Sequence, residues 1–227
     1  MLFDLDGTLV DSVYQHVIAW QQALGRVGIE LSVWRIHRRI GMSGGLLIHA
    51  LLRETGRQFG TDVHRQLHEV HAREYARFAS QIRPLPGARD LLARLDALAV
   101  PWAIATSGRA ESAAVALRSL DVPSHVPVVT REDVAHAKPD PDLFLEAARR
   151  LDVDITEAVV VGDSVWDLLA ARRARALGVG LLSGGNGREE LAGAGAYRVY
   201  EDPADLLRHL DEVGVRSPVS PVPDRRD

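Results

Sequence analysis

Short apolar runs alternate with amphipathic segments along the chain from residue 85 onward. The runs are short enough for buried strands, and they lie at 102–105, 126–129, 159–161, 179–182 and 197–200. Consecutive valines at 159–161 make the third run the most strand-like. Between the runs, apolar residues recur at helical spacing, predicting helices near 91–98, 111–120, 165–177 and 203–213, and one more that begins at Pro141. This alternation predicts an α/β fold, a Rossmann-like parallel sheet with helices on both faces.

The N-terminal third shows a different pattern. Leu2, Phe3 and Leu5 form a short apolar strand, and helical spacing then dominates residues 13–79. Apolar positions of this kind predict four helices, near 13–24, 33–40, 46–51 and 62–78. We therefore predict a core from residues 1–12 and 80–215, an inserted all-helical cap at 13–79, and a disordered, proline-rich tail at 216–227.

Some helix ends carry capping signals. Ser12 and Gln15 have the spacing of a capping box at the start of the first cap helix. Asp140 precedes Pro141 and is predicted to cap the helix that begins there.

Composition narrows the class of protein. A chain of 227 residues with 46% apolar content can bury a core and an insert. Its formal charge of −4 argues against a nucleic-acid partner. No apolar run is long enough to span a bilayer, no signal peptide is visible, and cysteine is absent, so we expect a cytoplasmic protein without a membrane partner. The oligomeric state is not readable from the pattern.

Two carboxylates follow the first strand. Asp4 and Asp6 lie two residues apart, on one side of an extended chain, and Gly7 permits a tight turn after them. Carboxylates held that closely repel, unless one is protonated or a hard cation such as Mg²⁺ binds between them. The alternative is an exposed acidic turn.

Polar residues also follow the later strands. Thr106-Ser107-Gly108 offers a hydroxyl and backbone N–H groups for an anion, or an ordinary helix cap. Asp163 follows the valine strand, and Asp167 lies one helical turn further on. Lys138 is the only lysine of the chain, while the other cations are arginines. The carboxyl ends of parallel strands meet at one edge, where ligands bind.

Taken together, these segments resemble the four motifs of the haloacid dehalogenase superfamily, in the family's order and over residues up to about 213. The resemblance implies that Asp4 is the nucleophile and Asp6 the general acid/base. It makes Thr106 and Lys138 the residues that hold the phosphoryl group, together with Ser107 and Gly108. It also implies a Mg²⁺ site formed by Asp4, the backbone carbonyl of Asp6, Asp163 and, directly or through a hydrogen bond, Asp167. The dehalogenase and phosphonatase branches of the superfamily lack the second aspartate of the first motif. The presence of Asp6 therefore favours phosphoryl transfer over those reactions.

The helical insert is similar to the family's cap of the first type. His16, Met42 and Ser43 then lie where the cap contacts substrate, a small phosphorylated metabolite. β-Phosphoglucomutase-like members use a lysine and an arginine around the cap loop, where this chain has Ile40 and Gly44, and they commonly carry a glutamate where it has Gly162. Their absence favours hydrolysis over a mutase reaction. A non-catalytic metabolite-binding protein on the same scaffold is a further alternative, against which the complete motif set argues.

Other features stay open. Only three residues precede Asp4, fewer than is usual in the family, so either the first strand is short or the native start lies upstream. Arg175 replaces a residue that is small in related members, and we expect it to crowd a packing site.

Two basic groups in the insert also have more than one interpretation. Histidines at 64, 68 and 71 share a helix face, which indicates a polar surface more readily than a metal site. Arginines at 35, 38 and 39 form either a solvated face or a substrate contact.

Overall fold

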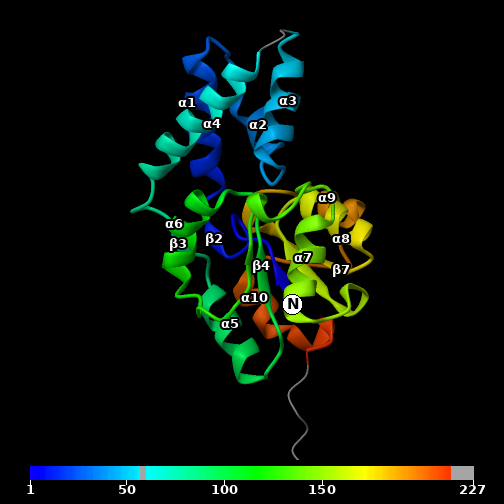
Figure 1. Ribbon diagram of the computed structural model, residues 1–227. Helices are drawn as coiled ribbons and strands as arrows, with labels where there is room; N and C mark the ends of the chain where they lie inside the picture. The colour runs from blue at the N-terminus through cyan, green and yellow to red at the C-terminus, as the bar shows by residue number, and fades with distance from the viewer. Residues whose placement is uncertain (57–59, 216–227) are drawn as a thin grey trace, which may run out of the picture.

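A parallel sheet forms the centre of the computed structural model, which describes residues 1–56 and 60–215 (Figure 1). Within that part of the chain the sheet has six strands, in the order β5-β4-β1-β6-β7-β8, all paired in parallel. Their bounds are β1 Leu2–Phe3, β4 Ala103–Ala105, β5 Val128–Val129, β6 Val159–Gly162, β7 Leu177–Leu181 and β8 Arg198–Tyr200. The predicted α/β class is confirmed.

The period of two along each strand divides the core between the two faces of the sheet. Leu2 and Val160 face one hydrophobic cluster, whereas Phe3, Ile104 and Val161 face the other. The second face is covered by α5, α6 and α10, and the first by α7 and α8. The bounds of these helices are α5 Ala88–Ala97, α6 Ala110–Leu120, α7 Asp142–Leu151, α8 Val165–Ala174 and α10 Pro203–Arg208. A further helix, α9 Arg188–Ala194, packs against α8 and β7.

Four helices stand above the carboxyl edge of the sheet and are called the cap below (Figure 1). They are α1 Val13–Arg26, α2 Val33–His37, α3 Gly44–Glu54 and α4 Thr61–Ala76. The cap has a hydrophobic cluster of its own, which includes Trp20, Ile36, Leu51 and Leu67. A two-stranded antiparallel ribbon, β2 Val10–Asp11 with β3 Arg83–Pro84, joins the chain segments that enter and leave the cap. The ribbon was not predicted, because two-residue strands carry no periodicity.

The structure corrects several predicted boundaries. The helix predicted over 165–177 ends at Ala174, because Arg175 adopts a left-handed conformation and Leu177 pairs with Val159 as the start of β7. The last predicted helix divides into α10 and a 3₁₀ turn, Leu210–Val213. Asp140 does not cap α7, whose N-cap is Pro141; it pairs instead with Arg173, the Nη1–Oδ1 distance being 3.0 Å.

The predicted tail at 216–227 lies outside the described residues. Among the residues that are described, no helix combines the length and apolar character that crossing a membrane requires.

Candidate active site

The two carboxylates after β1 occupy different environments. Asp4 extends the register of β1, its backbone N–H donating to the carbonyl of Val161 at 2.9 Å. Gly7 then turns the chain with φ +84°, and a Cβ there would lie 2.6 Å from Asp163 Oδ2. The turn directs Asp6 toward the cap, and it allows the Asp163 carboxylate to lie directly against Gly7. Because the chain turns at Gly7, Asp4 and Asp6 have different neighbours although they are only two residues apart.

Lys138 is completely buried beneath Asp4. Its Nζ donates to Asp4 Oδ1 and lies 2.8 Å from Asp167 Oδ1, while the ring of Phe144 packs 4.9 Å away. Burial alone would lower the pKa of Lys138, but Asp167 and Asp4 outweigh it and raise the pKa above its usual value. The lysine is therefore a fixed positive charge at the carboxyl edge of the sheet.

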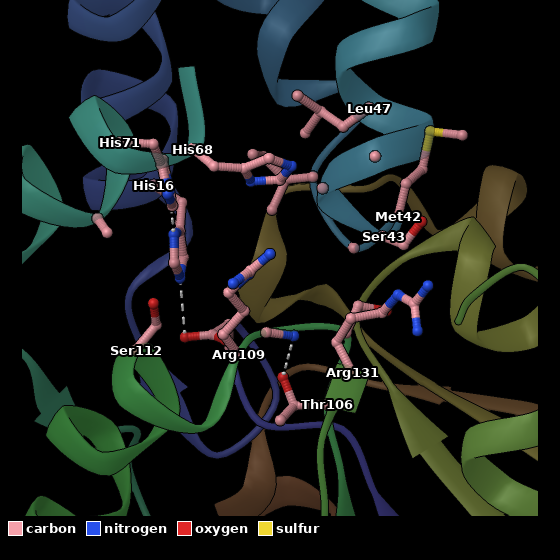
Figure 2. A pocket seen from close by; sticks show the side chains of 18 of the residues that line it. His16, Met42, Ser43, Leu47, His68, His71, Thr106, Arg109, Ser112 and Arg131 are labelled. Carbon is pink, nitrogen blue, oxygen red and sulfur yellow. Dashed lines mark hydrogen bonds and ion pairs between the residues drawn. The ribbon is translucent and has the colours of Figure 1, made fainter. Parts of the chain in front are cut away.

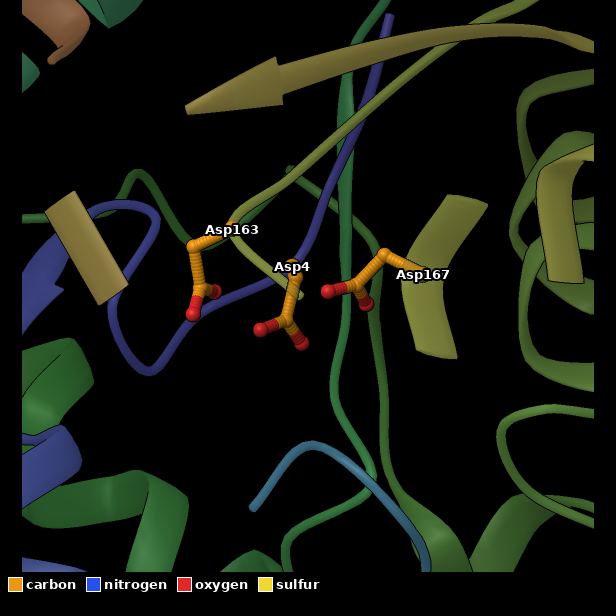
Figure 3. A group of neighbouring side chains, drawn as sticks. All are labelled: Asp4, Asp163 and Asp167. Carbon is orange, nitrogen blue, oxygen red and sulfur yellow. The ribbon is translucent and has the colours of Figure 1, made fainter. Parts of the chain in front are cut away.

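Asp4, Asp163 and Asp167 form a buried acidic cluster (Figure 3). Each offers a carboxylate oxygen, and these atoms lie within 4.8 Å of one another. Burial raises the pKa of Asp4 to about 7, an increase that Lys138 opposes and that Asp167 and Asp6 reinforce. Burial, followed by Asp167 and Asp4, also raises the pKa of Asp163 well above its usual value. Since a single ammonium faces several carboxylates, the donor set fits a hard divalent cation.

Asp167 and Asp163 each accept hydrogen bonds from a nearby hydroxyl residue, Ser164 and Thr8 respectively. Asp167 Oδ2 accepts from the backbone N–H of Ser164 at 3.0 Å and from its hydroxyl at 2.5 Å, closing a capping box at the start of α8. Thr8 donates to Asp163 Oδ1 at 2.9 Å. These bonds leave other oxygens of the cluster available for a cation.

Asp6 is surrounded by donors, most of them from the cap. Its Oδ1 accepts from the Ser12 hydroxyl at 2.6 Å and lies 3.2 Å from His16 Nε2 and 3.4 Å from the Tyr75 hydroxyl. Burial would raise the pKa of Asp6, but His16 and Ser12 outweigh it, so the pKa lies below its usual value. The predicted capping box of Ser12 with Gln15 is wrong, because the Ser12 hydroxyl is committed to the Asp6 carboxylate.

The segment after β4 closes the other side of the site. Thr106 Oγ1 accepts from the backbone N–H of Gly108 at 2.9 Å. The hydroxyl oxygen of Ser107 is buried without a hydrogen-bond partner. A buried polar atom without a partner at the mouth of a pocket is suited to a polar ligand.

A cavity of about 450 Å³ lies between the cap and this edge of the sheet (Figure 2). The predicted residues that line it are Asp4, Asp6, His16, Met42, Ser43, Thr106, Ser107 and Gly108. Lys138, Asp163 and Asp167 are not among the residues that line the cavity; each has a polar side-chain atom close to the Asp4 carboxylate instead. The structure thus brings the predicted groups together, and their chemical roles remain predictions.

Other lining residues were not predicted. Arg109 and Arg131 line the cavity from the segments that follow β4 and β5 (Figure 2). Arg131 donates to the carbonyl oxygens of Val134 and Ala135, at 2.7 and 3.2 Å. The signal that could have found them is their place directly after two strands of the predicted sheet.

The basic residues of the cap have structural partners. Arg35 and Arg39 both pair with Glu54, with N–O distances of 2.9 and 2.8 Å, and Arg38 pairs with Glu190 of the core. None of these arginines lines the cavity, so the solvated-face interpretation is favoured over substrate contact.

The cap histidines do not behave as one group. His64 and His68 are half-buried, whereas His71 is only 8% exposed, so the polar-surface interpretation is wrong for His71. Within residues 1–56 and 60–215, the acidic cluster is the only group arranged to ligate a metal. The histidine metal site is therefore not supported there.

A parallel sheet with a lysine, a carboxylate cluster and a covered cavity at its carboxyl edge has the arrangement of an α/β enzyme. The chain matches the haloacid dehalogenase-like hydrolase family over residues 1–175 and belongs to that family.

Similar proteins narrow the class further. The chain is 32% identical to validoxylamine A 7'-phosphate phosphatase of Streptomyces hygroscopicus subsp. limoneus, over 79% of this chain and 84% of that protein. It is 34% identical to hexitol phosphatase A of Escherichia coli (strain K12), over 74% and 76%. A hydrolase of solved structure from Pseudomonas syringae is 53% identical, with a TM-score of 0.92, covering 94% of this chain and 98% of that one. The chain is therefore a phosphatase of this family.

Proposed function

We propose that this protein is a Mg²⁺-dependent phosphatase of a small phosphorylated metabolite, acting through an aspartyl-phosphate on Asp4. One observation carries the proposal. Asp4 is buried, lines the cavity, is bonded to a buried lysine and lies among carboxylates, and the polar groups of Thr106 to Gly108 line the same cavity.

In the first step, the Asp4 carboxylate attacks phosphorus and the bond from phosphorus to the leaving oxygen breaks. The leaving oxygen takes a proton from Asp6, which lies at the cap side of the same cavity. The pKa of Asp6 is low in the free protein, but a bound phosphoryl dianion raises the pKa of a neighbouring carboxyl. The arrival of substrate therefore favours the protonated acid.

In the second step, Asp6 accepts a proton from water as the water oxygen attacks the phosphorus of the aspartyl-phosphate. The bond to Asp4 breaks, and inorganic phosphate leaves. Lys138 neutralises charge on Asp4 and on the phosphoryl group in both steps, while Thr106 and the unpartnered Ser107 hydroxyl hold phosphoryl oxygens.

Asp4, Asp163 and the backbone carbonyl of Asp6 would hold the Mg²⁺ ion, with Asp167 as a further ligand or hydrogen-bond acceptor. When bound, the ion supplies positive charge that offsets the carboxylates and the phosphoryl oxygens.

The cap supplies the rest of the substrate site. A cavity of about 450 Å³ suits a small metabolite, and we assign residues 13–79 as a cap domain whose Met42 and Ser43 face the leaving group. Relatives are named for validoxylamine A 7'-phosphate, for hexitol and for phosphoglycolate, so the assay panel begins with validoxylamine A 7'-phosphate, hexitol phosphates and phosphoglycolate. The lack of cysteine suits a cytoplasmic enzyme.

The test is phosphate release with and without Mg²⁺, in the wild type and in Asp4→Asn. An amide is a poor nucleophile, so we expect Asp4→Asn to lose more than about 10³-fold in kcat. Asp6→Asn should lose turnover but keep Mg²⁺ affinity in calorimetry, because its proposed metal contact is through the backbone. Asp90→Asn, at an exposed position of α5, is the matched control. Substantial turnover in Asp4→Asn would refute the covalent mechanism.

A phosphomutase on this scaffold would return the phosphoryl group to a second hydroxyl. At Gly44, where mutases of the family carry a cationic side chain, the ring of His68 fills the space: a Cβ there would lie 2.5 Å from His68 Cε1. This packing favours hydrolysis. Phosphorus NMR separates the two reactions, since a mutase gives an isomeric phosphomonoester and a phosphatase gives inorganic phosphate.

A further inference from the structure

A chain of hydrogen bonds links the cap to the oxygen atoms of Asp6. His71 Nε2, on α4, lies 3.1 Å from His16 Nδ1, on α1, and His16 Nε2 lies 3.2 Å from Asp6 Oδ1 (Figure 2). Both imidazoles are buried, with 8% and 9% exposure. The sequence pattern singled out His71 on a helix face, and no step of the proposed reaction uses it.

The chemistry of these rings determines how the protons are arranged. Asp6 Oδ1 already accepts from the Ser12 hydroxyl, and an ionised carboxylate can only accept, so His16 Nε2 donates to it. Burial, together with His16 and His68, lowers the pKa of His71 well below its usual value, so His71 is neutral at neutral pH. A neutral imidazole can donate or accept at Nε2, according to its tautomer. His71 can therefore pair with His16 whether His16 is neutral or protonated.

The rings have little freedom to rotate. His16 stacks on Tyr75, with ring centroids 3.9 Å apart and planes 6° from parallel. His71 stacks on Trp20 at 4.1 Å. Stacking fixes the plane of each imidazole, and the bond between the two rings fixes which nitrogen of His16 faces Asp6.

These contacts determine where the second carboxylate oxygen of Asp6, Oδ2, points. Ser12, His16 and Tyr75 all contact Oδ1. Oδ2 turns toward the segment from Thr106 to Gly108, since a Cβ on Gly108 would lie 3.9 Å from Oδ2 and 3.2 Å from Thr106 Oγ1. Holding Oδ1 thus presents Oδ2 to the cavity, where a proton is transferred.

We propose that His71 is a positioning residue for the acid/base step: it holds the His16 ring so that His16 Nε2–H binds Asp6 Oδ1 and leaves Oδ2 directed at the reacting oxygen. This inference rests on the proposed function, and specifically on the role of Asp6 as the acid. It makes acid/base chemistry depend on the packing of α4 against α1.

The test uses two leaving groups. An alkyl phosphate needs a proton on its leaving oxygen, whereas p-nitrophenolate leaves without one, and kcat/KM reports the step up to Asp4 phosphorylation. His71→Phe keeps an aromatic ring and removes Nε2. We expect it to lose about 10²-fold in kcat/KM for the best alkyl substrate, and less than about 3-fold for p-nitrophenyl phosphate. His71→Gln, whose amide can donate or accept, should recover most of the loss.

A double-mutant cycle tests the route of the effect. If His71 acts through His16, adding His71→Phe to His16→Phe should cost little more for the alkyl substrate. His64→Phe, on the same helix but outside the cavity lining, is the matched control, and Mg²⁺ affinity should stay unchanged in all variants. Should His71→Phe fail to fold, the comparison of His71→Gln with His71→Met carries the same test.

Equal losses for both leaving groups, no loss for either, or a Gln variant as impaired as Phe would each overturn the positioning role. Additive losses in the cycle would do the same. Failure of the proposed function is a separate result, seen as absent phosphate release by the wild type or unaffected turnover in Asp4→Asn.

Discussion

Lys138 shows how one side chain can be matched to its site. It has no exposed surface, and its ammonium lies between Asp4 and Asp167 with an aromatic ring beside it. A compact point charge satisfies both carboxylates at once. The planar guanidinium of arginine, used at every other cationic side chain except histidine, is wider and spreads its charge over a fork.

We predict that Lys138→Arg loses at least about 10²-fold in kcat, since a displacement of about 1 Å at a reacting group is enough for such a loss. Complete burial adds a cost of about 1–3 kcal/mol in stability from overpacking. Steady-state kinetics and thermal melting measure the two effects, with the exposed Arg118→Lys as control. Near-normal turnover in a folded Lys138→Arg protein would show that the single lysine reflects composition alone.

At the scale of elements, the loop before α3 combines a structural and a selective side chain. Ser43 is buried, caps α3 by accepting from Leu46 N at 3.4 Å, and donates its backbone N–H to the carbonyl of Lys138 at 3.2 Å. Met42 is half-buried and lines the cavity. The loop thus fixes the cap near the core through Ser43 and presents Met42 to substrate.

We predict that Met42→Ala changes kcat/KM unequally among substrates of different size, because a flexible apolar side chain is removed from the cavity wall. Ser43→Ala should lower stability by about 1 kcal/mol through loss of the cap, and it should change the ratios of kcat/KM among substrates less than Met42→Ala does. The phosphate-release panel and thermal melting decide the matter. Equal scaling by Met42→Ala would remove this loop from the selection of substrate.

The end of α8 is a second element-scale feature. Arg175 is exposed and has φ 64°, so it crowds no packing site, contrary to the sequence expectation. The left-handed backbone conformation of Arg175 is unfavourable for a residue with a Cβ atom. Glycine adopts this conformation without that penalty, so it suits the position better.

We predict that Arg175→Gly raises stability by up to about 1 kcal/mol, as relief of the left-handed conformation outweighs the added freedom of the unfolded chain. Arg172→Gly, exposed within the same helix, should lower stability by about 1 kcal/mol. Denaturant unfolding compares the two variants. Equal destabilisation by both would show that no strain resides at Arg175.

At the scale of the whole molecule, burial of the acidic cluster links folding to protons and to metal. The pKa of Asp4 rises from 3.8 to about 7 on folding, and that of Asp163 rises as well. Folding without metal therefore takes up protons. The stability from these groups is present below about pH 3.8 and is lost as pH rises through about 7.

A cation that binds the cluster in place of those protons should recover the stability lost at high pH. We predict that Mg²⁺ raises the melting temperature by several degrees at about pH 8 and much less at about pH 5. Removal of the ion with a chelator reverses the effect. Asp163→Asn should abolish most of the response, and Asp90→Asn should retain it. A shift of equal size at both pH values would contradict metal binding at this cluster.

The sequence by itself determined the alternating order of strands and helices and the groups that follow each strand. Asp4, Thr106, Lys138 and Asp163 could be assigned to one site because parallel strands end at the same edge of a sheet. Helix ends near Arg175 and after Arg208 were less accurate, because the backbone leaves the helical conformation at Arg175 and His209 for reasons that local propensity does not record.

Only the tertiary structure decided how the cap meets this edge. Ser12 has the pattern of a helix cap, yet its hydroxyl accepts from no backbone N–H of α1 and donates to Asp6, because a hydrogen bond to a charged carboxylate is stronger than one between neutral groups. Tyr75 contacts Asp6, and His71 contacts His16, although more than 50 residues separate the members of each pair in the sequence. Contacts between segments so far apart depend on the packing of α1 against α4, which no local pattern records.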